Sequence, residues 1–214
     1  MSEWLPFAVA IAASPFPVVP VILLLFTARP RAAAGAFLGG WAAGVLVPTA
    51  VFVALAEVVE REDYPPSWAS WVRIGIGAAL VVLGVRQWIA RRDVDEPPAW
   101  MGALRTAGPR TAARTALLLS VVNPKVLLLA AAGGLAIGAE ATGWLADVTS
   151  VVGFTLVASV SVAVPVVLFL LRGERMLRPL AVARDWLERN NATLMAVVIT
   201  VIGVAMLLKG FREL

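Results

Sequence analysis

Two short motifs place polar side chains beside proline inside otherwise apolar stretches of the chain. The first is Ser14-Pro15-Phe16-Pro17, and the second is Asn123-Pro124-Lys125. Proline lacks an amide hydrogen and disfavours helix in the residue before it, so each motif predicts a break in an α-helix. The helix that resumes after each break would present free N–H groups and a partial positive charge. Together with the Lys125 ammonium, these groups predict a substrate-binding site for an anion.

Lys125 needs a stabilising partner at the depth where its motif lies. The motif is about ten residues into its apolar stretch, which at about 1.5 Å per residue is near the midplane of a membrane. A lysine at that depth costs at least about 2.5 to 3.5 kcal/mol. We expect a ligand anion or water to offset this cost. A structural alternative is a clamp in which Lys125 binds the carbonyl that Pro124 frees at Ser120.

Further hydroxyl side chains fall within the apolar stretches. Such groups either line a polar cavity or hydrogen-bond a neighbouring helix, and the sequence leaves both roles open. The candidate cavity-lining residues are Thr49, Ser120, Thr155 and Ser159, with Ser161 as a further hydroxyl of this kind. Glycines are expected at close helix contacts instead. They are Gly39, Gly40, Gly44, Gly75, Gly77, Gly84, Gly133, Gly134 and Gly203.

The composition indicates a membrane protein. The 214 residues are 60% hydrophobic and 15% charged, with a mean hydropathy of +0.87. At about 20 residues per crossing, this leaves room for about six spans and little else. The absence of cysteine and histidine removes disulfides, thiolate metal sites and the usual neutral-pH general base. We therefore expect no enzyme, no catalytic residues, no cofactor and no metal.

The predicted fold is an all-α polytopic membrane protein with six transmembrane helices. Each apolar stretch is long enough for a tilted helix, and the first is longer than the hydrophobic part of a signal peptide. The predicted spans are Trp4–Thr27, Ala33–Ala56, Trp68–Ile89, Thr115–Ile137, Trp144–Leu171 and Ala192–Leu208.

Arginine concentrates in alternate loops between these spans. Loop 28–31 holds two arginines, and loops 91–114 and 172–189 hold five each, whereas loops 57–63 and 139–147 are mainly acidic. The positive-inside rule then puts the basic loops in the cytoplasm and both termini outside the cytoplasmic membrane. Because topology accounts for the pI near 10.6, we do not expect nucleic-acid binding.

Most tryptophans support the predicted span boundaries. Tryptophan is enriched where a membrane meets water, because its ring is apolar and its N–H is polar. Trp41 fits this pattern less well, because it falls inside the second span. The residues at boundaries or in loops are Trp4, Trp68, Trp71, Trp88, Trp100, Trp144 and Trp186.

The six spans divide into two groups of three that would enter the membrane from opposite sides. The first helix of each group carries a polar-proline break, the second carries Pro48 or Pro165, and the third carries Gly84 or Gly203. This correspondence predicts an inverted repeat. The first repeat would be residues 1–90, a basic cytoplasmic linker residues 91–114, and the second repeat residues 115–214.

These motifs together resemble the glycolipid-addressing protein (GAP) family within the LysE amino-acid exporter superfamily. The resemblance covers nearly the whole chain, and the Asn-Pro-Lys step is its most specific part. It is carried by Ser14-Pro15-Phe16-Pro17, Val21 to Leu25, Gly40-Trp41 to Gly44, Gly77 to Gly84, and Asn123-Pro124-Lys125-Val126-Leu127.

The resemblance implies a membrane transporter or flippase-like carrier for an anionic lipid or lipid-linked glycan of the cell envelope. Alternating access would rock one repeat against the other around the two breaks. The alternatives are a LysE-like exporter of small amino acids and a non-transporting assembly factor for lipid export. The expected partners are membrane lipids, together with a second copy of the chain or envelope lipid-export proteins.

Overall fold

The fold is helical throughout the part of the chain that the structure describes. This computed structural model describes residues 3–14, 16–60, 67–89, 104, 106–140, 143–183, 185–186, 200 and 204, and no strand occurs among them. The all-α prediction is therefore confirmed for these residues. The elements in chain order are α1 (Leu5–Ala12), α2 (Val18–Leu24), α3 (Pro30–Glu60), α4 (Ser67–Ile89), α6 (Pro109–Val121), α7 (Pro124–Ala139), α8 (Trp144–Arg172) and the 3-10 turn η2 (Gly173–Met176).

Both predicted helix breaks are present. The first predicted span is divided into α1 and α2, which end and begin on either side of the Ser14 motif. The fourth is divided into α6 and α7, which are bent by 69° at residues 122–123. Helix α6 also begins earlier than the predicted Thr115, because Pro109 provides a favourable first helical residue. The end of the predicted linker 91–114 is thus helical.

Two long helices run without interruption through an internal proline. They are α3, which contains Pro48, and α8, which contains Pro165. Residues Pro30–Ala56 and Trp144–Ala183 are long and apolar enough to cross a membrane, and the bent pair α6–α7 adds a third crossing if it is counted as one span. The sixth predicted span, Ala192–Leu208, lies largely outside the described residues, and the six-span repeat stays a prediction.

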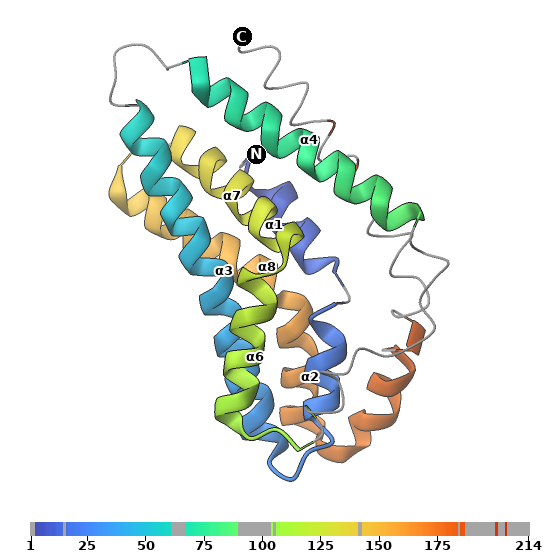
Figure 1. The fold of residues 1–214 in the computed structure, drawn as a ribbon. Coiled ribbons are helices and arrows are strands. Elements are labelled where there is room, and N and C mark those ends of the chain that lie inside the picture. The colour runs from blue at the N-terminus through green and yellow to red at the C-terminus, as the bar shows by residue number, and fades with distance from the viewer. Residues whose placement is uncertain are drawn as a thin grey trace.

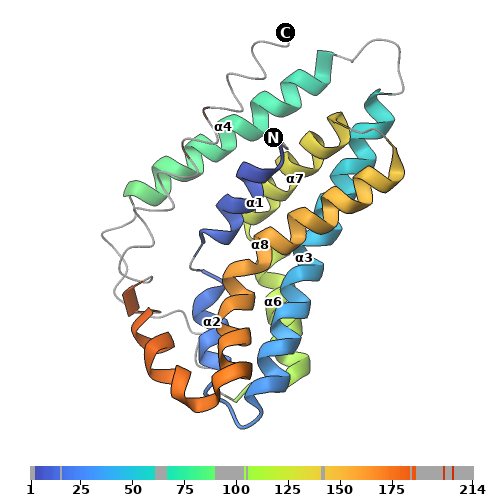
Figure 2. The same cartoon turned by 180° about the vertical axis from the view of Figure 1, so that it is seen from behind.

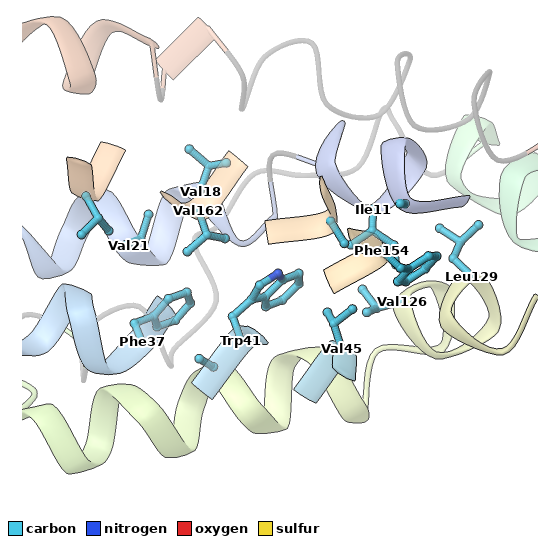
Figure 3. Packing of buried hydrophobic residues seen from close by; sticks show 14 of the residues in the cluster. Ile11, Val18, Val21, Phe37, Trp41, Val45, Val126, Leu129, Phe154 and Val162 are labelled. Carbon is cyan, nitrogen blue, oxygen red and sulfur yellow. The ribbon is translucent and has the colours of Figure 1, made fainter. Parts of the chain in front are cut away.

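Helix α3 packs against α6, α7 and α8, as the two opposite views in Figures 1 and 2 show. Its buried face carries Phe37, Trp41 and Val45 at a spacing of four residues, and these side chains form the middle of the apolar core in Figure 3. This spacing places them along one stripe of the helix. Helix α3 therefore connects the broken pair α6–α7 with α8.

Glycine permits the close approach of these helices. A Cβ atom added at Gly40 would overlap the backbone of Ala113 in α6, and one at Gly44 would overlap the Ser120 side chain. In α7, a Cβ at Gly134 would lie 2.6 Å from the carbonyl oxygen of Thr49 in α3. The predicted close helix contacts are confirmed for Gly40, Gly44 and Gly134, and the same prediction is wrong for Gly39 and Gly75, where an added Cβ has no atom within 4 Å.

We predict that Gly134→Ala destabilises the protein, whereas Gly39→Ala does not. The added methyl at position 134 meets backbone, and overpacking of this kind costs about 1 to 3 kcal/mol. Gly39 has no atom within 4 Å of an added Cβ, and a helical glycine replaced by alanine gains roughly 0.5 to 1 kcal/mol. Thermal unfolding of both variants in detergent measures the difference, and equal effects would contradict the packing described here.

Candidate functional site

A buried hydrogen bond joins the two proline motifs. The Nζ atom of Lys125 donates to Oγ of Ser14 over 2.7 Å, across 111 positions of sequence. Ser14 is 1% exposed and Lys125 is 7% exposed. A hydrogen bond from a charged donor is stronger than a neutral one, and low local polarity strengthens it further. The two breaks therefore meet inside the protein, where the ammonium of the second motif contacts the hydroxyl of the first.

Asn123 and Pro124 set the position of Lys125. Asn123 has an extended backbone, and its Oδ1 accepts a hydrogen bond from the Lys125 N–H at 3.0 Å, which caps the start of α7. Pro124 occupies the first helical position, where its missing N–H costs nothing. The Lys125 ammonium thus belongs to the first turn of a 16-residue helix, where the helix dipole is also positive. The charge of the lysine and the partial charge of the helix terminus therefore lie close together.

The first break lies between α1 and α2. The Ser14 N–H donates to the carbonyl of Ile11 over 3.1 Å, which ends α1 with a short turn. Pro17 is buried and precedes α2, whereas Phe16 is half-buried. The predicted site residue Pro15 lies outside the described residues. The Ser14 hydroxyl is the side-chain group of this break that faces Lys125.

Three of the four predicted cavity-lining hydroxyls are satisfied within their own helices. Thr49, Ser120 and Thr155 are buried, and each donates to a carbonyl three or four residues earlier at 2.8 to 3.0 Å. Serine and threonine side chains within helices commonly hydrogen-bond the carbonyl one turn earlier. The fourth, Ser159, is buried without such a bond among the described residues. The cavity-lining role of these four hydroxyls stays a prediction.

The hydrogen bond between Lys125 and Ser14 could not be predicted from one sequence. A clamp between Lys125 and the Ser120 carbonyl stays a prediction. Nothing in the local pattern of either motif encodes a contact between residues so far apart.

Among the described residues, no group of three or more His, Cys, Asp or Glu side chains is placed to hold a metal ion.

Comparison with known proteins gives one clear result. Residues 4–212 match the family described as Sap, sulfolipid-1-addressing protein. The chain belongs to this family. No curated protein and no solved structure matches it. Membership of the sulfolipid-1-addressing family confirms the resemblance inferred from the two motifs and supports a lipid-related function in a membrane. Placement of the sulfolipid-1-addressing family within the LysE superfamily stays a prediction.

We predict that Ser14→Ala and Lys125→Met have strongly non-additive effects on stability. Removing the Ser14 hydroxyl takes an acceptor from a buried ammonium, and a hydrogen bond to a charged group contributes about 1.5 to 3 kcal/mol. Once Lys125 is methionine, Ser14→Ala should cost much less. Unfolding free energies of the single and double variants in detergent give this coupling energy.

Thr49→Val provides the matched control. Its hydroxyl is equally buried but bonds its own helix, so its effect should add to that of Lys125→Met within about 0.5 kcal/mol. Additive effects for Ser14 and Lys125 would show that their hydrogen bond does not hold the two breaks together.

Proposed function

We propose that the chain is a carrier for an anionic lipid or lipid-linked glycan of the cell envelope. The observation that carries this proposal is the buried Lys125 ammonium at the meeting point of two broken helices. A carrier needs a charged site in the protein interior that can exchange a protein partner for a ligand. The proposal involves no bond chemistry, so the protein would not be an enzyme and would need no cofactor.

The groups at the site suit an anion such as a sulfate or phosphate. Lys125 supplies a full positive charge and the start of α7 adds a partial one. Ser14 accepts from Lys125 and carries one hydroxyl hydrogen, which it can donate to a ligand oxygen. Asn123 would position the lysine through the cap, with its side-chain amide within reach of the headgroup.

An apolar surface beside the second break is compatible with a lipid substrate. Leu118 and Val122, in the last turn of α6 and at the bend, are 60% and 71% exposed. Acyl chains could lie against these side chains while the headgroup reaches Lys125.

The Lys125–Ser14 hydrogen bond suggests how transport would be coupled to a change of shape. Its two residues belong to the two predicted repeats, and each lies where its helix is already interrupted. A ligand anion that replaces Ser14 as partner of Lys125 would loosen the contact between the repeats. Alternating access across an inverted repeat of six spans is the motion that we propose. The basic loops favour a cytoplasmic membrane with both termini outside.

We predict that Lys125→Gln lowers retention and transport of the anionic lipid at least tenfold, whereas Lys125→Arg preserves much of both. Glutamine keeps hydrogen-bonding capacity but loses the charge, which is the feature that the proposal requires. Native mass spectrometry of the gently solubilised protein measures the retained lipid, and a vesicle assay measures its transfer. Equal membrane insertion of wild type and variants is the necessary control.

A charge reversal in a basic loop tests the alternative functions. Arg175 lies in η2 and is exposed, so Arg175→Glu should leave lipid retention within about twofold of wild type. An assembly factor for lipid export predicts the reverse, with the loop variant defective and Lys125→Gln active. Amino-acid efflux that depends on Lys125, with no specific lipid retained by wild type, would favour the exporter.

A further inference from the structure

Helix α1 packs against helices of the other predicted repeat. It lies beside α7 and α8, as Figures 1 and 2 show from opposite sides, whereas α2 packs against α3 and α8. Helix α1 ends at Ala12 and α2 begins at Val18, so residues 13–17 interrupt the helix. Interruptions of this kind can act as hinges, because a few residues absorb the change in backbone torsions. The first break is therefore suited to let α1 move relative to α2.

An aromatic contact holds the start of α1. The rings of Trp4 and Phe154 meet edge to face, with their centroids 6.1 Å apart. Gly153 leaves room for this contact, since an added Cβ there would lie 3.3 Å from Cη2 of Trp4. Phe154 is fully buried, and its ring occupies space that a Cβ at Gly133 of α7 would need. The Trp4 ring therefore rests on a surface that α7 and α8 form together.

Hydrogen bonds tie both ends of α1 to α7. At its start, the Glu3 N–H donates to Oε1 of Glu140, the residue that follows α7, over 3.0 Å. At its end, Ser14 accepts from Lys125 in the first turn of α7. Helix α1 therefore runs antiparallel along α7, with Lys125 at its hinge end.

Little apolar surface holds α1 between these two ends. Its buried residues are Ala8, Ala10 and Ile11, and an alanine side chain is a single methyl group. Burial stabilises in proportion to apolar area, so the two alanines add less than larger side chains would. Helix α7 is fixed on its other side, because Gly134 lets it approach the backbone of α3. The contacts at the ends of α1 therefore carry much of its attachment.

We propose that α1 is a lid over the Lys125 anion site, with its hinge at residues 13–17. The lid opens when Trp4 leaves α8 and Glu3 leaves Glu140, which exposes Lys125 toward the end of the bundle that carries Glu140. A ligand anion that replaces Ser14 as the partner of Lys125 releases the hinge end of α1 and so favours opening. The inference rests on the proposed carrier and names the element that moves in it.

The reactivity of a single cysteine measures the opening of the lid. The chain contains no cysteine, so Val126→Cys introduces the one thiol. Val126 is 1% exposed, and Figure 3 shows it near Phe154 and near Ile11 of α1. The charged, water-soluble thiosulfonate MTSET reaches a buried position only when the local structure opens, so its reaction rate reports the open fraction. Trp4→Ala removes the aromatic contact and should raise this rate about tenfold in detergent.

A second variant and two controls accompany this measurement. Glu140→Ala changes an exposed residue and removes one hydrogen bond of the lid, so it should raise the Val126→Cys rate about threefold. Trp144→Ala is the matched loss of a tryptophan, at a position of α8 that is 75% exposed, and should leave the rate unchanged. Leu24→Cys is a fully buried reporter in α2, beyond the hinge, and Trp4→Ala should change its rate less than about twofold.

Two results would overturn the lid. An unchanged Val126→Cys rate in both Trp4→Ala and Glu140→Ala would show that α1 stays closed without these contacts, and it would leave the carrier proposal standing. An equal rise at Val126→Cys and Leu24→Cys would show a general loosening of the bundle. The carrier proposal fails on a different measurement, namely if Lys125→Gln retains the anionic lipid as wild type does.

Discussion

The burial of one ammonium group in an apolar bundle is the constraint on which the site depends. Lys125 is 7% exposed, and a charge in such surroundings must be stabilised by polar groups placed within hydrogen-bonding reach. The structure meets this requirement by interrupting the helices on both sides. The first interruption supplies the Ser14 hydroxyl, and the second sets the lysine at the start of α7. Either break alone would leave the arrangement incomplete.

The packing of α3 makes this arrangement rigid. Gly40 and Gly44 allow α6 to approach α3 before the bend, and Gly134 allows α7 to approach it afterwards. Both halves of the broken pair are thus held against one continuous helix. The bend of 69° between them is consequently supported from one side, and the orientation of Lys125 follows from the packing of the helices rather than from its own rotamer alone.

Local features of this structure could be predicted from the sequence, and long-range features could not. Proline removes a hydrogen-bond donor wherever it stands, so the interruptions near Ser14 and Asn123 followed from residue types alone. The start of α6 at Pro109 was missed, because a basic, proline-containing segment also fits a loop. The contact between Ser14 and Lys125 was missed as well, since it depends on how the helices associate. The hydroxyls of Thr49 and Thr155 bond their own helices, which a sequence cannot distinguish from a bond to a neighbour.

The polar side chains of the interior differ in what a ligand would have to displace. Lys125 and Ser14 already pair with each other, so a ligand must compete with a protein contact and gains only the difference in free energy. Thr49 and Thr155 bond the backbone of their own helices, so these hydroxyls join no second helix in the described structure. The Lys125–Ser14 pair joins the two breaks, so it is the polar contact suited to couple ligand binding to a change of conformation.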